Sequence, residues 1–329
     1  MDRQEHSAPI EARDLVKTYR SGKATLRALD GLTLEAQSGT VFGLLGPNGA
    51  GKSTAVKILT TLSAPDSGRA LVAGQDVVRH PDRVRAAIGV VGQKGAVDPD
   101  ATGRENLWLQ GHFHGLDAGV IRRRSEELLT RFGLADAANR IVRTWSGGMQ
   151  RKLDVAIGLI HRPQVLFLDE PTTGLDPEAR ADLWQEIERL TADGMTLLLT
   201  THYLDEADRL ADQVAIIDHG RIVASGSPEA LKSELRGDAI VVELQQAPQN
   251  GTATAALAAV RGMRDAVIDG RTLRARADDG AAAVPSVLSA LDAAGLAVAA
   301  VTVARPSLDD VYFRHTGRSY RPETQEAAR

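Results

Sequence analysis

The chain has 329 residues, of which 39 are basic and 43 acidic, and its formal net charge is -4 with histidine neutral. This length fits one or two domains, and the slightly acidic balance argues against a protein that coats nucleic acid, which needs an excess of Lys and Arg. Hydrophobic residues make up 43% and cysteine is absent, which excludes wholesale disorder, disulfides, zinc–thiolate and iron–sulfur sites, and thiol catalysis.

Residues 10–19 and 26–36 mix apolar and polar side chains at short spacing, which predicts antiparallel strands joined by a turn at Ser21-Gly22-Lys23. The short apolar run 41–45 predicts a buried strand, and residues 52–62 suit a helix. The first part of the chain therefore starts with an antiparallel sheet and then passes into a strand–helix unit.

Further apolar runs at residues 165–168 and 196–200 predict buried strands, and residues 178–190 predict a helix with one apolar face. Buried strands that alternate with amphipathic helices predict a parallel sheet covered on both faces. Between them, residues 100–160 have a charged, helical pattern, which predicts a helical insert on the sheet domain.

After a hairpin predicted at residues 214–224 the composition shifts toward Ala and Val, so we expect a domain boundary near residue 236. The elements predicted beyond it follow the order strand, helix, strand, strand, helix, strand, which is the ferredoxin-like arrangement. They cover residues 239–244, 253–261, 264–269, 272–276, 284–294 and 296–303. Ser307, with Asp310 three residues on, predicts the cap of a final helix, and the tail over residues 318–329 is expected to be flexible.

The strongest motif lies at residues 46–53, which match G-x-x-x-x-G-K-[ST] between an apolar strand and a helix, the context that this motif requires. Its glycines let successive backbone N–H groups point at phosphate oxygens, and the helix N-terminus adds positive potential. Lys52 is expected to reach the β- and γ-phosphates and Ser53 to bind Mg²⁺. The alternative is a Gly-rich turn with a solvated Lys, but a chance match is expected only about 0.01 times in this chain. The residues expected to hold the phosphates are Gly46, Pro47, Asn48, Gly49, Ala50, Gly51, Lys52, Ser53 and Thr54.

A second element is the apolar run that ends in Asp169-Glu170, which places two carboxylates at the carboxyl edge of the sheet, where ligands bind. Asp169 is expected to hold Mg²⁺ and Glu170 to act as the general base for an attacking water. Taken alone, the pair could be a solvated strand end. A third element, Ser146-Gly147-Gly148, opens a helix and can offer a hydroxyl and N–H groups to a γ-phosphate, or can be an ordinary helix cap.

Together these segments resemble the ATP-binding-cassette (ABC) family over about residues 8–235, although Trp145 and Met149 stand where its LSGGQ signature has Leu and Gln. The resemblance implies a P-loop NTPase of the ABC type. Its α/β fold class has a nucleotide-binding domain over residues 1–235, with a mixed sheet, an antiparallel β subdomain and the helical insert. A small C-terminal α+β domain over residues 236–317, for which the element order predicts the ferredoxin-like arrangement, follows it.

The resemblance also implies roles for residues whose surroundings specify little by themselves. Gln93 looks like the glutamine that contacts Mg²⁺ or the attacking water, and His202 like the switch histidine that touches the γ-phosphate. Asp176 looks like the aspartate of the D-loop, and Tyr19 is placed as the aromatic residue on which adenine stacks. Taken singly, each of these residues could be a surface, edge-strand or helix-capping side chain.

Two features are similar to the daunorubicin- and doxorubicin-export class of this family. One is the SGGM form of the signature with Arg-Lys-Leu-Asp at 151–154, and the other is Pro-Ser-Leu-Asp-Asp-Val-Tyr at 306–312, followed by Thr316-Gly317. This likeness implies an ATPase subunit that powers export of a drug or hydrophobic natural product. Alternatively, the ending caps an accessory domain with no shared substrate, or one that serves dimerisation or regulation.

The resemblance implies ATP and Mg²⁺ as cofactors and a head-to-tail homodimer that encloses two ATP molecules. The longest weakly polar run, residues 293–304, is shorter than the roughly 20 residues that span a bilayer, and the charged N-terminus lacks a secretory signal. We therefore expect a separate membrane permease and a cytoplasmic protein peripheral to the inner face of the membrane, with no nucleic-acid partner. Alternatives are a soluble ABC ATPase acting on ribosomes or DNA, which usually has two cassettes or long coiled coils, and a cofactor-assembly or drug-sequestering protein.

Overall fold

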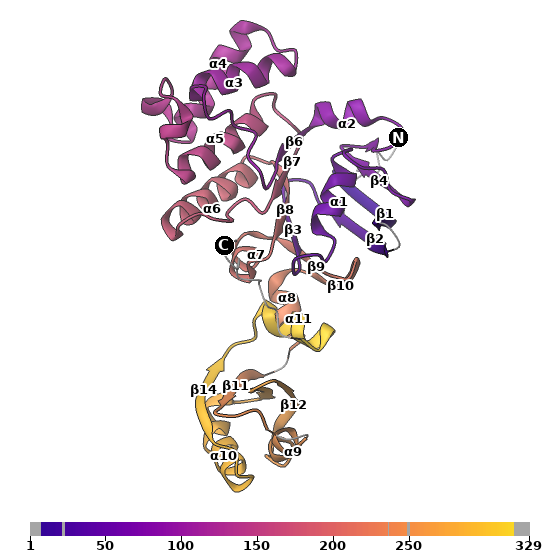
Figure 1. Cartoon of the computed structure of the whole chain (residues 1–329), viewed down its shortest axis with the longest axis vertical. Coiled ribbons are helices and arrows are strands. Elements are labelled where there is room, and N and C mark those ends of the chain that lie inside the picture. Colours follow the sequence, from indigo (N-terminus) through magenta and orange to yellow (C-terminus); the bar gives the residue numbers. More distant parts are fainter. Residues whose placement is uncertain (1–7, 22–23, 236, 249–250, 319–329) are drawn as a thin grey trace, which may run out of the picture. The chain divides into compact units, whose positions relative to one another are not determined.

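The residues that the computed structural model describes are 8–21, 24–235, 237–248 and 251–318. They divide into two compact units, the first running to Ser225 and the second beginning at Gly226 (Figure 1). The boundary predicted near residue 236 stays a prediction of where an accessory domain starts. The tail predicted over residues 318–329 lies, apart from Arg318, outside the described residues.

The first unit begins with the expected antiparallel sheet, whose strand order is β2-β1-β4-β5. Its strands are β1 (Ile10–Ser21), β2 (Ala24–Ala36), β4 (Ser67–Val72) and β5 (Gln75–Asp76). Alternating residues of β1, such as Ile10 and Ala12, are buried, so one face of this sheet packs on the core. The predicted β1–β2 pairing is confirmed, whereas residues 22 and 23 of the predicted turn lie outside the described residues.

The second sheet of this unit forms its centre and has the order β10-β9-β3-β8-β7-β6. Its strands are β3 (Val41–Leu45), β6 (Ile88–Val91), β7 (Val165–Asp169), β8 (Thr196–Thr201), β9 (Gln213–Asp218) and β10 (Arg221–Gly226). Strands β6, β7, β8, β3 and β9 pair in parallel. Their buried apolar side chains explain the uninterrupted hydrophobic runs in the sequence. All five carboxyl ends therefore meet at one edge of the sheet.

Helices connect the strands of this sheet (Figure 1). They are α1 (Lys52–Leu59), α2 (Pro81–Ala87), α3 (Gly103–Phe113), α4 (Ala118–Arg131), α5 (Gly147–Leu159), α6 (Pro177–Ala192) and α7 (Leu204–Leu210), with short 3₁₀ helices at Ala135–Ala137 and Val142–Thr144. Helices α3, α4 and α5 lie in the predicted insert. Helix α1 ends three residues before the predicted end at residue 62, because Thr61 adopts a left-handed conformation that breaks the helix.

Trp145, which replaces the signature leucine, has a structural explanation in the insert. Its side chain is buried and packs on the first residue of α3, where a Cβ on Gly103 would lie 2.5 Å from the indole ring. The close approach permits a larger apolar side chain than leucine immediately before Ser146 without exposing it.

Among the described helices, none has both the length and the hydropathy that crossing a bilayer demands.

The second unit contains an antiparallel sheet of order β12-β13-β11-β14, with α9 and α10 packed on it. Its sheet is formed by β11 (Asp238–Leu244), β12 (Met263–Asp269), β13 (Thr272–Ala277) and β14 (Val298–Ala304), and its helices are α8 (Pro228–Ser233), α9 (Thr252–Ala258), α10 (Gly280–Ala293) and α11 (Leu308–Thr316). The order of strands and helices confirms the ferredoxin-like arrangement. Helix α10 starts four residues before the predicted residue 284, where Asp279 accepts a hydrogen bond from the Ala282 N–H.

The segment Pro306–Tyr312 gives this unit its last helix. Ser307 and Asp310 form the predicted capping box at the start of α11. Residues of β13 alternate, so that Leu273 and Ala275 enter the core while Arg274 and Arg276 project from the other face of the strand. Arg274 pairs with Asp309 at 2.7 Å, which ties α11 to the sheet.

Two stacked imidazoles join the insert to the central sheet. The ring centroids of His114, at the end of α3, and His161, after α5, lie 3.6 Å apart at an interplanar angle of 6°. His161 Nε2 lies 2.9 Å from the carbonyl oxygen of Ile88 on β6. Burial, with a smaller contribution from His114, lowers the pKa of His161 to about 4, so both the stack and its carbonyl contact suit a neutral ring.

We predict that His161→Gln reduces the pH dependence of stability. Below the usual histidine pKa of 6.5 the unfolded chain takes up a proton that folded His161 binds only near pH 4, so stability falls as the pH drops through this interval. At pH 7 the variant should lose about 1 kcal/mol of stacking. By pH 5 the deficit should shrink or reverse, since the wild type loses about 1–2 kcal/mol once partial exposure is discounted.

Denaturant unfolding of the full chain at the two pH values measures this difference. His80→Gln, at an exposed histidine before α2, is the matched control and should show no such trend. A deficit for His161→Gln that is constant from pH 7 to pH 5 would contradict the assignment of a neutral buried ring.

Candidate active site

The predicted phosphate loop connects β3 to α1 and takes a conformation that requires its glycines. Gly51 has a φ of 116°, and a Cβ there would lie 2.5 Å from the carbonyl oxygen of Ala28. A Cβ on Gly46 would lie 2.4 Å from the carbonyl oxygen of Ile217. Any larger residue would therefore push the loop away from the sheet.

Lys52 lies inside this loop and not in solvent, since only 4% of the residue is exposed. Its Nζ donates hydrogen bonds to the carbonyl oxygens of Gly46, at 2.6 Å, and Pro47, at 3.2 Å. The ammonium group thus holds the loop around itself, at the N-terminus of α1. Ser53, the next residue, is exposed.

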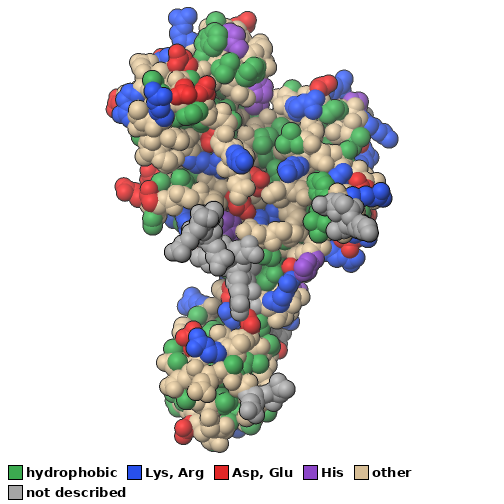
Figure 2. All heavy atoms as spheres, in the orientation of Figure 1, with side chains coloured by type: hydrophobic (Ala, Val, Ile, Leu, Met, Phe, Trp, Pro, Cys, Tyr) green, Lys and Arg blue, Asp and Glu red, His purple; other side chains and the backbone are tan. Residues whose placement is uncertain are grey.

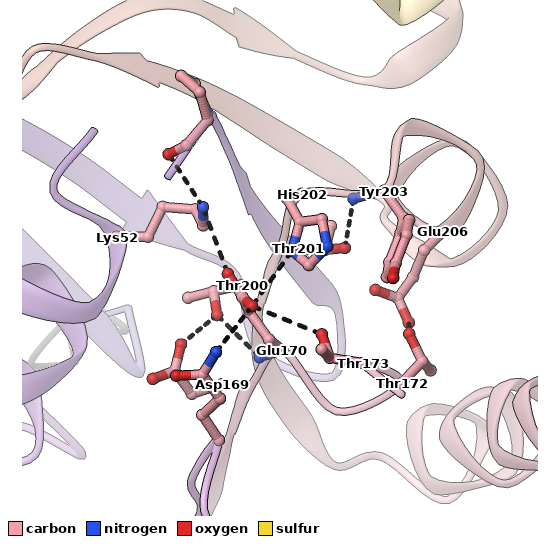
Figure 3. A network of polar contacts seen from close by, with 12 residues as sticks. Lys52, Asp169, Glu170, Thr172, Thr173, Thr200, Thr201, His202, Tyr203 and Glu206 are labelled. Carbon is pink, nitrogen blue, oxygen red and sulfur yellow. Dashed lines mark hydrogen bonds and ion pairs between the residues drawn. The ribbon is translucent and has the colours of Figure 1, made fainter. Parts of the chain in front are cut away.

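Glu170 brings together side chains that the sequence predicted as parts of one site (Figure 3). Lys52 Nζ lies 3.5 Å from its Oε1. Gln93 Nε2 donates to its Oε2 at 3.3 Å, and His202 Nδ1 lies 3.2 Å from the same oxygen. Lys52 begins α1, which follows β3, whereas Gln93, Glu170 and His202 follow β6, β7 and β8. The four side chains converge because these strands end at one edge of the sheet.

The backbone at Glu170 is strained and is fixed by the neighbouring strand. Its φ of 49° is unfavourable for a residue with a side chain. Its N–H donates to the carbonyl oxygen and to Oγ1 of Thr200, both at 3.1 Å, and the Thr200 hydroxyl donates to Asp169. Thr200 thereby holds the carboxylate of Asp169 and the main chain at Glu170, whose side chain lies toward Lys52.

The electrostatics of the cluster favour an ionised carboxylate. Burial by itself raises the pKa of Glu170, but the contacts with His202 and Lys52 outweigh burial and hold that pKa below its usual value. Burial lowers the pKa of Lys52, which its attraction to Glu170 and Asp169 partly offsets. A carboxylate that is charged, largely buried and hydrogen-bonded from several sides can orient a water molecule and accept a proton from it.

The Ser-Gly-Gly segment and Asp176 lie together at a different place. Ser146 caps α5 by accepting a hydrogen bond from Met149 N–H at 3.2 Å, and Asp176 caps α6 by accepting one from Ala179 N–H at 2.8 Å. Both line one surface hollow together with Gly148, and the residues of that hollow include none of Lys52, Gln93, Glu170 and His202. The sequence-predicted residues therefore form two groups within one chain.

Tyr19 belongs to neither group. It lies near the end of β1 in the antiparallel sheet, is 38% exposed, and has Lys17 Nζ 5.7 Å from its ring centroid. The ring is available to a flat ligand from the solvent side. Its role in stacking stays a prediction.

Three residues at the site were not predicted as site residues. They are Thr200, Arg151 and Glu206, of which Arg151 was noted only as part of a family likeness. Glu206 on α7 is fully buried, and its Oε1 accepts hydrogen bonds from Thr172 Oγ1 at 2.8 Å and from Trp184 Nε1 at 3.0 Å. Nothing in the sequence distinguishes Glu206 from the other acidic residues of α7, because its burial depends on how α6 and α7 pack.

Oxygen atoms that suit a hard cation border the carboxylate cluster. Asp169 is the last residue of β7 and Ser53 is the second residue of α1. No group of three or more His, Asp and Glu that could hold a metal by protein ligands alone occurs in the part of the chain that the structure describes. This sparse set of oxygen donors fits Mg²⁺, which keeps several waters and is held by few protein ligands together with phosphates.

Comparison with known proteins finds transport ATPases. The family model described as "ABC transporter" matches residues 29–173, and the model described as "ATP-binding protein DrrA1-3-like, C-terminal domain" matches residues 226–316. The chain is 49% identical over 302 residues to the daunorubicin resistance ATP-binding protein DrrA3 of Streptomyces coeruleorubidus, across 92% of this chain and 94% of that protein. It is 40% identical over 303 residues to the Nod factor export ATP-binding protein I of Ralstonia nicotianae, across 92% of each.

A solved structure has the same fold. It is a dimeric ATP-binding cassette in a post-hydrolysis state, bound to ADP and Pi, and is 25% identical with a TM-score of 0.61. The match covers 66% of this chain and 98% of that one. The expected fold of the nucleotide-binding part is thereby confirmed.

We predict that the stability of Glu206→Gln, measured relative to that of the wild type, increases as the pH rises. Burial raises the pKa of Glu206, although hydrogen bonds from Thr201, Trp184 and Thr172 oppose this. As the pH rises above the usual value of 4.5, the unfolded carboxyl loses its proton before the folded one, so the wild type loses stability. Glutamine does not ionise and keeps an oxygen acceptor, so the stability of the variant relative to the wild type should increase from pH 5 to pH 8.

Unfolding measurements at the two pH values, with Glu35→Gln at an exposed glutamate as control, decide the point. A stability difference that does not change with pH would show that Glu206 is ionised in the folded protein throughout.

Proposed function

The chain belongs to the ABC transporter ATPases, in their daunorubicin-resistance type, and on this premise we propose that it powers the export of a drug or related hydrophobic natural product. It binds and hydrolyses ATP for a transporter. The observation that supports the assignment of its site most directly is the meeting of Lys52 and Glu170, 3.5 Å apart, at the N-terminus of α1. A phosphate-binding lysine and a water-activating carboxylate then act on one triphosphate.

In this proposal the loop of residues 46–54 binds the phosphates with its backbone N–H groups. Lys52 leaves the carbonyl oxygens of Gly46 and Pro47 and binds the β- and γ-phosphates. Ser53, Asp169 and Gln93 would hold Mg²⁺, which supplies charge neutralisation for the phosphate oxygens when it is bound.

Glu170 is the proposed general base. Its lowered pKa keeps it ionised at neutral pH, so Oε2 can accept a proton from a water positioned for attack on the γ-phosphorus. His202 and Gln93 both contact that oxygen and restrict the carboxylate to one orientation. The water oxygen then bonds to the γ-phosphorus as the bond between that phosphorus and the bridging oxygen breaks, which gives inorganic phosphate and ADP. Lys52 stays paired with the β-phosphate until ADP is released.

The separation of the two residue groups supports a dimer. One chain supplies one phosphate loop and one Ser-Gly-Gly segment, and these line different surfaces. A second copy, related head to tail, would bring its Ser146, Gly147 and Gly148 to the γ-phosphate, with Asp176 beside them. The added N–H groups close the open side of the site and exclude water from it.

The insert offers a surface for a separate permease. Exposed apolar residues gather on α3, where Trp108 is 52%, Leu109 43% and Phe113 74% exposed. Figure 2 shows that hydrophobic side chains reach the surface there among side chains of both charges. Apolar side chains of this size on one short helix favour a protein contact. We propose that this face binds the permease and holds the chain at the inner face of the membrane.

We predict that Glu170→Gln binds ATP with little change in the dissociation constant but hydrolyses it at least about 100-fold more slowly, because the base is lost. With ATP the variant should accumulate as a dimer in size-exclusion chromatography. Lys52→Ala is the contrasting variant, and its dissociation constant should rise about tenfold because a charged phosphate contact is lost. Turnover of Glu170→Gln near the wild-type rate would remove Glu170 as the base.

We predict that Trp108→Ser/Phe113→Ser weakens membrane association and leaves ATP hydrolysis by the isolated chain within about twofold, because the exposed side chains contact a partner and not the nucleotide. The measurement is recovery in the membrane fraction on co-expression with a candidate permease that recruits the wild-type chain to the membrane. Leu26→Ser is the matched control, since Leu26 is 64% exposed on β2 of the antiparallel sheet. Equal membrane recovery of the double variant and the control would contradict the docking face.

A further inference from the structure

We propose that Arg151 and Asp154 of α5 form a positioning pair that sets Gln93 and Glu170 against each other for hydrolysis. Neither residue contacts the proposed position of the nucleotide, so both act through the segments that they hold. This inference rests on the proposed function only in the catalytic roles of Gln93 and Glu170. The contacts of the pair are properties of the fold.

One guanidinium group holds the backbone beside both catalytic side chains. Arg151 Nη1 donates to the carbonyl oxygen of Gly92 at 2.8 Å, immediately before Gln93. Its Nε donates to the carbonyl oxygen of Pro171 at 2.7 Å, immediately after Glu170. Its Nη2 donates at 3.4 Å to the carbonyl oxygens of Asp169 and of Glu170 itself. All three nitrogens are therefore used on the ends of β6 and β7.

Asp154, one turn later on α5, holds the other side of the same loop. Its Oδ1 accepts a hydrogen bond from Ala96 N–H at 2.8 Å, and Oδ2 lies 3.5 Å from Arg151 Nη1. A Cβ on Gly95 would lie 2.5 Å from Oδ2, so the loop runs directly over the carboxylate. Gln93 is thus bracketed, with Arg151 bound before it and Asp154 bound after it.

The burial of the pair argues against an incidental surface ion pair. Arg151 is 9% exposed and Asp154 7%. Removing two charges from water is costly, and a pair alone seldom repays it, so further hydrogen bonds to both partners are needed. Here those bonds go to the two segments that end in the proposed water-orienting residues. A lysine would keep the charge but lacks the planar fork that reaches carbonyl oxygens on both strands at once.

The same rigid helix begins at the Ser-Gly-Gly segment. Arg151 stands five residues after Ser146, about 7.5 Å along the helix axis. Because α5 is a continuous helix over Gly147–Leu159, its orientation fixes the guanidinium and hence the separation of Gly92 from Pro171. A change of about 1 Å in the position of Gln93 or Glu170 would be enough to slow catalysis about 100-fold.

The test separates turnover from binding in the purified full chain. Arg151→Lys and the double variant Arg151→Met/Asp154→Leu should each lower kcat about 10- to 100-fold, while the dissociation constant for ATP changes less than about twofold because the phosphate loop is untouched. The double variant removes both buried charges together and so avoids an unpaired carboxylate that would threaten folding.

Arg124 provides the matched control for Arg151→Lys. It also donates to a main-chain carbonyl oxygen, that of Leu159 at 3.0 Å, and to a carboxylate three residues on, Glu127 at 2.7 Å. Its contacts lie on α4 and at the end of α5 and reach neither Gln93 nor Glu170. Arg124→Lys should leave kcat within about twofold of the wild type, as exposed and partly exposed ion pairs contribute little.

Hydrogen exchange without nucleotide gives a readout that does not require hydrolysis. The double variant should exchange the backbone amides of residues 93–97 and of Glu170, Thr172 and Thr173 faster than the wild type, and the exchange of β3 should not change. Unchanged exchange in these segments, a kcat within twofold of the wild type, or a rise in the dissociation constant as large as the fall in kcat would each overturn the positioning role. If the wild type did not hydrolyse ATP but the exchange pattern followed expectation, the proposed function would be wrong, whereas the positioning of the two loops by Arg151 and Asp154 would be supported.

Discussion

The ion pair between Lys52 and Glu170 is the interaction on which the site depends. It joins the phosphate loop to the end of β7 in a place where both side chains are almost entirely buried. Two buried charges persist because each has further polar contacts, with Lys52 on the loop carbonyls and Glu170 on His202 and Gln93. The pair also keeps a cation where phosphate is to bind and a carboxylate where water is to be activated.

The parallel sheet makes this convergence possible. Strands β6, β7, β8 and β3 end at one edge, so residues that follow them meet although they are far apart in the chain. Thr200 on β8 donates a hydrogen bond to the carboxylate of Asp169 and accepts one from the backbone N–H of Glu170. Arg151 adds hydrogen bonds to the main chain that follows β6 and β7. The polar groups at this edge are satisfied by one another, which holds the strained backbone of Glu170 in place.

In the second unit, ion pairs hold the C-terminal helix α11 to the antiparallel sheet of the same unit. Alternation along β13 sends Leu273 and Ala275 into the core and leaves arginines on the other face, where the acidic start of α11 binds them. The Pro-Ser-Leu-Asp-Asp-Val-Tyr segment, which marks the chain as one of the resistance type, therefore has a packing role within this unit. That role explains its pattern of one capping serine, two acids and buried apolar residues.

The sequence alone determined what depends on neighbours along the chain. The glycines and lysine within residues 46–53 identify their loop because the motif is complete in eight consecutive residues. Apolar runs identify buried strands because burial on both faces leaves no polar positions. Ser307 and Asp310 specify a helix start for the same local reason. The tertiary structure alone decided that Thr200, Arg151 and Glu206 are buried around Glu170 and its loop, and that Ser146 and Asp176 form a separate group. Their partners lie on other strands and helices, and the burial that gives a polar side chain its role arises only when those elements pack.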